Sequence, residues 1–264
     1  MSPPLALLKS FVLILAAVLL PAALLVMLYA VTWTGRLIGI AGFFISVGPL
    51  LWSIGTERKS ALLARSGQLI LSLGVATLII IVSRLPNGQR PETSRFHARY
   101  ADGGWHHQRF GPAGLLREID QIHLGFSAAL ILDPLFSRAQ HRELVDMTNH
   151  IYADMKVDPD FEFSASGLSS IYQEMASFDF RDGHYFHYIP PNLDRSKPSQ
   201  TLVFLHGSGG NFKAYIWLLS KVADRVGCTV IAPTFGLGNW EQDGAYEAIT
   251  AAIRDANRHA VIDP

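Results

Sequence analysis

The sequence has few of the residues that mark an ordinary soluble or disulfide-stabilised domain: one cysteine and a low proportion of charged residues in 264 positions. The single cysteine, Cys228, excludes an intramolecular disulfide, but it leaves the redox compartment open because many exported proteins have no disulfides. Charged residues make up 17% of the chain against 49% hydrophobic residues, and the formal net charge is zero. A neutral chain offers no broad electrostatic attraction to polyanions, so we expect no nucleic-acid partner.

Charge is also missing from three long apolar runs near the N-terminus, at residues 11–31, 37–54 and 66–83. A hydrocarbon core of about 30 Å needs roughly 20 apolar residues in a helix. We therefore predict three transmembrane helices within a region that spans residues 1–85, with the lipid bilayer as a partner. A cleaved signal peptide is the alternative for the first run, but no small-residue cleavage pattern follows it and two further apolar runs do.

The loop between the second and third apolar runs indicates the orientation of this integral membrane protein. It carries Arg58, Lys59 and Arg65 against Glu57, so the positive-inside rule places it in the cytoplasm. The third helix then leads out, and the chain after Arg84 is expected to be extracytoplasmic. The arginines that follow favour the opposite orientation, although long domains translocate largely regardless of their charge.

The middle segment, residues 86–176, carries no motif that indicates chemistry. Residues 86–112 are rich in Pro, Gly, Arg and His, which predicts a linker or an irregular cover, whereas residues 113–156 have a helical pattern. Within the latter, the apolar run 124–136 is too short to span a bilayer and predicts a packed or interfacial helix. Histidines are plentiful, but neither HExxH nor paired CxxC spacing occurs, so we expect no metal site and no cofactor.

From residue 177 onward, short apolar runs alternate with turns, which predicts an α/β fold. Strands are expected at residues 184–189, 201–205 and 228–232, and the second of these is a continuous apolar run typical of a strand buried on both faces. Asn211 is predicted to cap the helix that follows it. The expected apolar face of that helix consists of Tyr215, Leu218, Leu219, Val222, Ala223 and Val226. A second helix, with apolar positions from Ala245 to Ala260, completes a strand–helix–strand–helix order typical of a parallel sheet.

A glycine-rich turn, His206-Gly207-Ser208-Gly209-Gly210, lies between the strand at 201–205 and its helix. A dinucleotide-binding loop would need a glycine where Phe212 stands, and the lysine motif of a P-loop is absent. Two interpretations remain open. The turn is either purely structural, or an oxyanion hole whose backbone N–H groups stabilise the negative oxygen of a tetrahedral intermediate, each contributing on the order of 3 kcal/mol.

The segment from Thr201 to Gly210, with Val230–Trp240, resembles α/β-hydrolases of the esterase, dienelactone-hydrolase and prolyl-oligopeptidase-like groups. The resemblance implies that residues 177–264 form part of a hydrolase sheet, up to the family's fourth strand and its first two helices. It also implies that the Ser208 backbone N–H, together with that of Gly209, is an oxyanion donor. The candidate pocket-lining residues under this resemblance are Asn211, Tyr215, Phe235, Asn239 and Trp240.

In the family, a fifth strand leads into the G-x-S-x-G nucleophile elbow, and the catalytic acid and histidine follow later. Residues 258–264 resemble the link into that strand, so no residue of the chain is assigned to the catalytic triad, and His206 is not the triad histidine. Without a fifth strand, the third strand has an open apolar edge, which is an aggregation hazard. We therefore expect the 264 residues to be a fragment or a truncated gene product.

Two functions of different classes fit these patterns. The first is a membrane-anchored serine hydrolase that cleaves ester or peptide bonds of small-molecule or peptide substrates, with this chain as an incomplete, inactive portion. The second is a non-catalytic, membrane-tethered interaction module that retains a hydrolase remnant.

Overall fold

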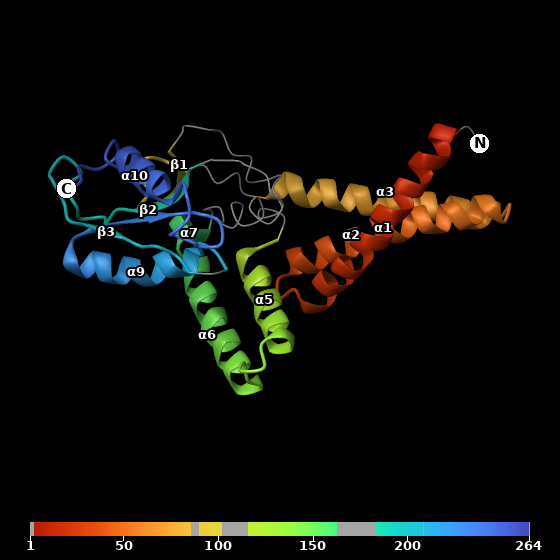
Figure 1. Cartoon of the computed structure of the whole chain (residues 1–264), viewed down its shortest axis with the longest axis horizontal. Helices are drawn as coiled ribbons and strands as arrows, with labels where there is room; N and C mark the ends of the chain where they lie inside the picture. Colours follow the sequence, from red (N-terminus) through yellow and green to blue (C-terminus); the bar gives the residue numbers. More distant parts are fainter. Residues whose placement is uncertain (1–2, 86–89, 102–115, 163–182, 208, 264) are drawn as a thin grey trace. The chain divides into compact units, whose positions relative to one another are not determined.

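The computed structural model describes residues 3–85, 90–101, 116–162, 183–207 and 209–263 (Figure 1). The chain divides into two compact units, one formed by residues 1–85 with 115–141 and the other by residues 86–114 with 142–264. Helix α5 (Glu118–Leu132) therefore belongs to the N-terminal unit, whereas strand β1 (Phe96–Tyr100) belongs to the C-terminal unit.

Three long apolar helices form most of the N-terminal unit: α1 (Pro3–Tyr29), α2 (Trp33–Glu57) and α3 (Ala61–Arg84). Each contains a stretch long and apolar enough to cross a membrane, so an integral membrane protein is indicated, as the sequence predicts. Helix α2 packs against both of the others. Small residues permit this close approach, because a Cβ added at Gly39 would lie 2.4 Å from the Met27 backbone nitrogen, and one at Gly67 would lie 2.4 Å from that of Trp52.

Polar contacts fasten both ends of this bundle. At one end, the Lys9 ammonium donates to the Glu57 carboxylate at 2.8 Å and joins the start of α1 to the end of α2. At the other end, the fully buried Asp120 of α5 accepts hydrogen bonds from the backbone N–H groups of Val31 and Thr32 at 2.7 and 2.8 Å. The Thr32 hydroxyl also donates to Asp120, at 2.6 Å. Helix α5 is therefore tied to the connection between α1 and α2.

The C-terminal unit contains a mixed sheet of β1, β2 (His184–Tyr188), β3 (Thr201–Val203) and β4 (Thr229–Pro233), in the order β1-β2-β4-β3. Strands β3 and β4 are parallel, as expected for two strands joined by a crossover helix. Strand β2 runs antiparallel to both of its neighbours, β1 and β4. An α/β class is consistent with this architecture, and β1 lies in the segment that the sequence pattern assigned to a linker.

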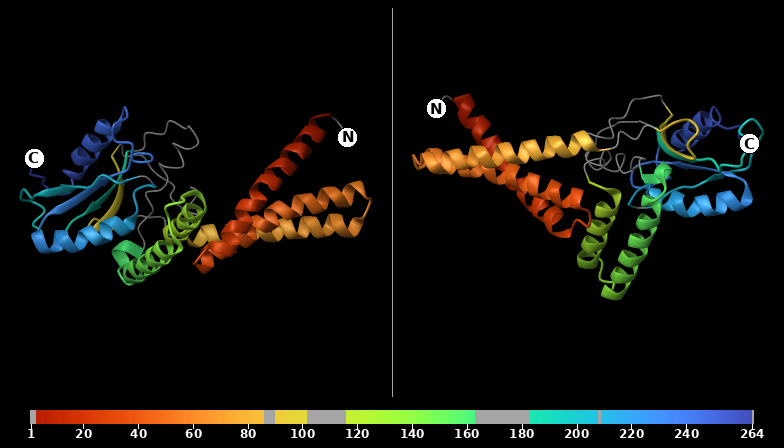
Figure 2. Two further views of the ribbon diagram at one scale, coloured as in Figure 1. Left: turned by 60° about the horizontal axis from the view of Figure 1, so that its bottom comes forward. Right: turned by 180° about the vertical axis from the view of Figure 1, so that it is seen from behind.

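Helices cover both faces of the sheet. Helix α9 (Lys213–Val226) lies on one face and α10 (Ala245–Ala256) on the other (Figure 2). The larger core lies on the α9 side, where the end of α6 (Arg138–Lys156) and the short helix α7 (Pro159–Glu162) contribute Met155 and Phe161. The smaller core on the α10 side contains Tyr185, Ile231, Ala252 and Ala256.

Two sequence predictions about burial were wrong. Leu202 and Leu205 are 38% and 42% exposed, because β3 has a neighbouring strand on only one side over its described length. Helix α9 buries Ile216, Trp217, Ser220 and Ala223, whereas the expected face members Leu218, Val222 and Val226 are each more than half exposed. Trp217 is buried instead, with its ring edge-to-face against Phe161 at a centroid distance of 4.9 Å, so the face of α9 that meets the core is centred on Trp217.

Candidate functional site

The glycine-rich turn lies at the carboxyl end of β3, directly before α9. Strand β4 is parallel to β3, so the segment that follows β4, residues 234–240, emerges at the same edge of the sheet. Ligand sites in open α/β sheets lie outside the carboxyl ends of the strands. The two segments that the sequence singled out for a pocket are therefore brought together where such a site is expected.

His206 connects these two segments. Its ring is buried, and its Nε2 accepts a hydrogen bond from the backbone N–H of Phe235 at 3.1 Å. An accepting Nε2 requires the proton to be on Nδ1, which lies 3.0 Å from the carbonyl oxygen of Gly207. The carbonyl oxygen of His206 accepts from the Trp240 indole at 2.8 Å. The neutral His206 ring thus joins the glycine turn to the segment after β4.

The turn itself adopts a backbone conformation that favours glycine. Gly209 and Gly210 have φ angles of +105° and +112°, and the N–H of Gly210 donates to the Gly207 carbonyl at 3.3 Å. Gly207 and Gly209 are exposed, so the outer side of the turn is open to solvent. Ser208, whose N–H is the principal oxyanion donor under the resemblance, lies outside the described residues.

Asn211 has a different role from the one predicted. The N-cap position of α9 is Phe212, which makes no side-chain capping bond, and the fully buried Asn211 amide donates to β4 instead. Its Nδ2 lies 2.8 Å from the carbonyl oxygen of Ala232 and 3.0 Å from the Thr234 hydroxyl. Its Oδ1 is buried and has no hydrogen-bond partner among the described residues. Asn211 therefore fixes the base of the turn to the end of β4, because bonding two buried acceptors outweighs one capping bond.

The other candidate pocket residues fall into two groups. Phe235 and Trp240 stack obliquely with ring centroids 5.6 Å apart, and the Trp240 ring also meets the edge of His206 at 5.3 Å. Tyr215, in the first turn of α9, packs 5.6 Å from the ring of Phe212. Asn239 is exposed. Thus Phe235 and Trp240 lie directly beside the glycine turn and give this edge an aromatic wall.

Gly238 is a site residue that the sequence analysis did not identify. Its φ is +82°, and a Cβ at this position would lie 2.7 Å from the carbonyl oxygen of His206 and 2.9 Å from that of Gly207. Only a residue without a side chain allows the backbone after β4 to approach the turn so closely. The sequence does contain two glycines, Gly236 and Gly238, soon after Pro233, which indicates a turn. It does not show that Gly238 faces the segment at His206 and Gly207.

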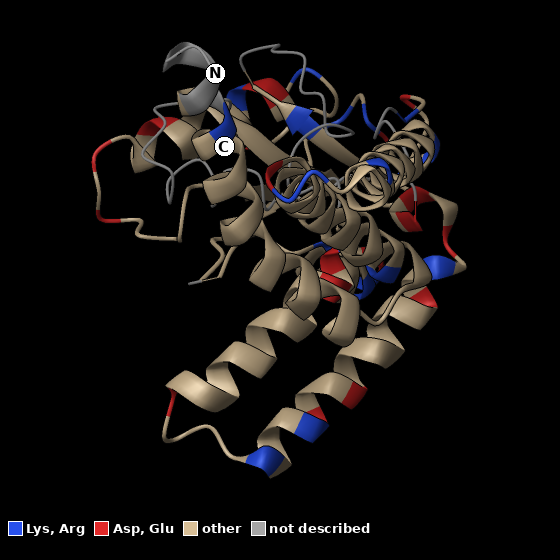
Figure 3. Ribbon diagram, turned by 90° about the vertical axis from the view of Figure 1, so that its right-hand side faces the viewer, with Lys and Arg blue, Asp and Glu red and all other residues tan. Residues whose placement is uncertain are grey.

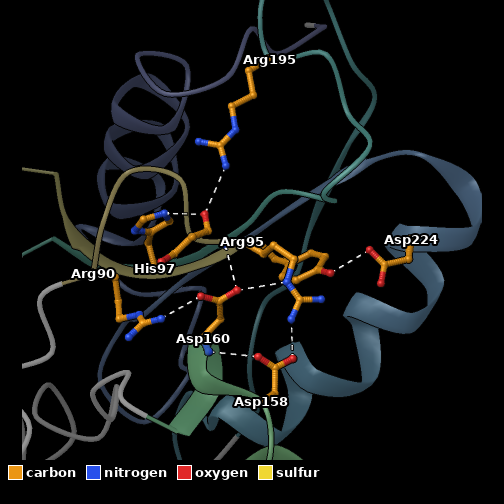
Figure 4. Close-up of polar contacts among 9 residues, drawn as sticks. Arg90, Arg95, His97, Asp158, Asp160, Arg195 and Asp224 are labelled. Atoms are coloured by element: carbon orange, nitrogen blue, oxygen red, sulfur yellow. Dashed lines mark hydrogen bonds and ion pairs between the residues drawn. The ribbon is translucent and has the colours of Figure 1, made fainter.

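A second polar cluster, shown in Figure 4, fastens α7 to the segment around β1. The Arg95 guanidinium donates to the carboxylates of Asp158 and Asp160, and Arg90 donates to Asp160 at 2.9 Å. Burial of Asp160 acts to raise its pKa, but hydrogen bonds from the two arginines outweigh this effect and lower the pKa. The arginines and aspartates of this cluster form ion pairs with one another, which is typical of a structural ion-pair network.

Two buried histidines, His97 and His187, lie directly opposite each other on β1 and β2. Burial, followed by the nearby Arg99, lowers the pKa of His97 to about 4 and that of His187 well below its ordinary value. The His97 Nε2 lies 2.9 Å from the Ser94 carbonyl, whereas neither ring nitrogen of His187 has a hydrogen-bond partner among the described residues. Both rings are therefore neutral near pH 7.

Within the described ranges, no group of three or more His, Cys, Asp or Glu side chains is placed to hold a metal ion. Comparisons of the chain with protein-family models, with curated proteins and with solved structures found no match. The candidate site thus consists of an open glycine turn, held by hydrogen bonds of His206 and Asn211, beside the aromatic wall of Phe235 and Trp240.

Proposed function

We propose that the chain carries the oxyanion-binding half of a membrane-anchored serine hydrolase with the α/β-hydrolase fold, which cleaves ester or peptide bonds. The observation that carries this proposal is the turn at Gly209 and Gly210, whose left-handed backbone lies at the carboxyl end of β3. The Gly210 N–H is bonded within the turn, so we assign the outward donors to the N–H of Gly209 and, under the resemblance, to that of Ser208. Preorganised N–H donors of this kind stabilise the charge that develops on a carbonyl oxygen during acyl transfer.

The rigidity of the surroundings supports a catalytic turn over a merely flexible one. The fastenings made by His206, Asn211 and Gly238 come from both sides of the turn and limit its movement. An oxyanion hole depends on such preorganisation, because donors that must reorient during the reaction lose much of their benefit. The aromatic wall of Phe235 and Trp240 would exclude water from one side of the substrate carbonyl.

The hydrogen bonds around β3 give further support. The carbonyl of Gln200 accepts from Thr229 on the β4 side, whereas the N–H and carbonyl of Ser199 point away from β4 and bond to residues 261–263. The bridge between Ser199 and Ile262 is parallel. Residues 261–263 therefore lie beside Ser199 on the side away from β4, which is the side on which the resemblance expects the family's fifth strand. In the proposed enzyme, the nucleophilic serine, its acid and its histidine follow that strand.

In the proposed mechanism, the serine attacks the substrate carbonyl while the histidine accepts the serine proton. The carbonyl oxygen then carries the negative charge of the tetrahedral intermediate and receives N–H donors from the turn. The histidine next protonates the leaving alcohol or amine, and water hydrolyses the acyl-enzyme by the same steps. The role proposed for the described residues in these steps is that of the N–H donors.

The proposal is tested on protein immunopurified from its native membrane, using a fluorophosphonate probe that reacts covalently with activated serines. We expect labelling of one serine in a G-x-S-x-G sequence, located by peptide mapping, with heat-denatured protein as the control. If the folded native protein takes up no probe, the hydrolase proposal fails and the non-catalytic interaction module is favoured.

A further inference from the structure

Helix α5 presents an apolar surface that the rest of the described chain does not cover. Between Asp120 and Asp133 the helix has no Lys, Arg, Asp or Glu, whereas charges reappear at Arg138 in α6 (Figure 3). Ile131 and Leu132 at its end, and Leu135 in the following corner, are 84%, 79% and 87% exposed. Several large aliphatic side chains together at such exposure indicate a contact surface.

The first turn of α5 lies at the level where the membrane-spanning helices end. Asp120 accepts three hydrogen bonds from Val31 and Thr32, which connect α1 to α2. The next residue, Trp33, is 77% exposed, and the Arg36 guanidinium lies 5.9 Å from its ring. Tryptophan and arginine at the end of an apolar span are typical of the membrane–water interface. Helix α5 therefore begins at the interface.

The connectivity places α5 on the side of the membrane that the chain reaches after α3. Helix α1 crosses to the side of Thr32, and α2 crosses back to the side where Glu57 pairs with Lys9. Helix α3 then crosses again and ends at Arg84, on the same side as Thr32. Among the described residues, no further span lies between α3 and α5, and the Asp120 hydrogen bonds agree with this topology.

The direction of α5 keeps it at this level. Figure 3 looks along the bundle, so that α2 and α3 are seen end-on while α5 is seen from its side. A helix of 15 residues is about 22 Å long, which is shorter than the roughly 30 Å of a hydrocarbon core. Because it lies crosswise to the spans, α5 carries Ile131 and Leu135 along the membrane surface and away from the bundle.

We propose that α5 and the corner at residues 131–135 lie on the lipid bilayer and insert their apolar side chains at the boundary between headgroups and acyl chains. The Asp120 hydrogen bonds hold the start of α5 at the connection between α1 and α2, where these spans reach the membrane surface, and this position selects lipid as the occupant. Apolar faces of interfacial helices enter this boundary by about 5–10 Å. The proposal rests on the membrane spans and not on the proposed hydrolase function.

The test uses the full chain with Cys228→Ala, reconstituted into phosphatidylcholine vesicles and carrying one nitroxide label at a time. Labels at I131C and L135C report on the proposed surface, L132C repeats the measurement, and E143C is a matched position at an exposed polar site in α6. Collision rates are measured with oxygen, which partitions into lipid, and with a water-soluble nickel chelate. We expect the proposed surface to collide with the chelate several-fold less often than E143C does, with oxygen access retained.

Two outcomes would overturn the proposal. Chelate access at I131C and L135C equal to that at E143C would show that the corner lies in water. Exclusion of both reagents would show that protein covers it, either the rest of this chain or a second copy. Neither outcome bears on fluorophosphonate labelling, so this proposal and the hydrolase proposal can fail independently.

Discussion

Replacing Gly238 with alanine perturbs the proposed oxyanion turn from outside, without changing any residue of the turn. The new Cβ would lie 2.7 Å from the His206 carbonyl oxygen and 2.9 Å from the Gly207 carbonyl oxygen. Favourable contacts between carbon and a carbonyl oxygen lie at about 3.3–3.6 Å. Because both opposing atoms belong to the backbone, relief requires the turn or the 234–240 segment to move by roughly 0.6 Å.

The cost has two parts. A side chain at φ +82° costs about 1–2 kcal/mol, the usual penalty for a left-handed conformation. Displacing packed backbone adds about 1–3 kcal/mol, by analogy with overpacked cores. Gly227→Ala is a matched control, because Gly227 has φ +79° and a Cβ there would meet nothing within 4 Å. Gly227→Ala should lose only the conformational part of the stability, so the free energies of unfolding of the two variants should differ by about 1–3 kcal/mol.

The comparison is made by urea unfolding of the full chain in detergent, followed by tryptophan fluorescence, with hydrogen exchange of residues 206–210 as a local readout. We expect Gly238→Ala to unfold at lower urea than Gly227→Ala and to exchange faster in the turn. Equal losses of stability and unchanged exchange in both variants would refute the close approach of the 234–240 segment to the turn, and with it the rigidity on which the proposed site depends.

Two further predictions concern buried polar groups of the sheet. Because the pKa values of His97 and His187 are depressed in the folded state, the unfolded chain binds more protons below its own histidine pKa of about 6.5. The stability that these neutral histidines contribute should therefore be fully present above that pH and should fall towards pH 4, where each histidine contributes a slope of about 1.4 kcal/mol per pH unit. Replacing His187 with Phe should remove the slope that His187 contributes. An unchanged slope in urea unfolding at pH 5–7 would contradict this. Asn211→Ala should cost about 1–3 kcal/mol, because the Thr234 hydroxyl and the Ala232 carbonyl lose a donor, whereas Asn239→Ala, at an exposed position, should cost under about 0.5 kcal/mol in the same assay.

The parts of the fold that sequence could predict are those set by local periodicity. Three uncharged runs of membrane length gave the three long helices, and the alternation of short apolar runs with turns gave β2, β3, β4 and the helices α9 and α10. Gly227 directly follows the last apolar position of α9, where a glycine is typical, and it ends the helix with φ +79°. Such signals lie within a few residues of the feature they specify, so a single sequence contains them.

The missed features depend on contacts between distant segments. Strand β1 has no strong apolar alternation, and it forms because β2 offers a free edge that its residues can pair with. The burial of Trp217 in place of Val222 is decided by Phe161, far away in the sequence. Likewise, Asn211 does not cap α9, because its amide donates to the buried carbonyl of Ala232 in β4, which lies 21 residues away in the sequence.

The proposed catalytic role of the turn is hard to read from sequence for a further reason. An oxyanion hole works through backbone N–H groups, and side chains mark it only indirectly, through the glycines that its conformation requires. Gly209 and Gly238 both have positive φ, yet one belongs to the turn itself and the other only makes room for it. Sequence gives them the same letter, whereas the structure separates them by what surrounds them. At Gly209, where a Cβ would meet nothing closer than 3.9 Å, the need for glycine is the backbone conformation that sets the direction of its own N–H. At Gly238, where a Cβ would meet carbonyl oxygens, the need for glycine is close packing.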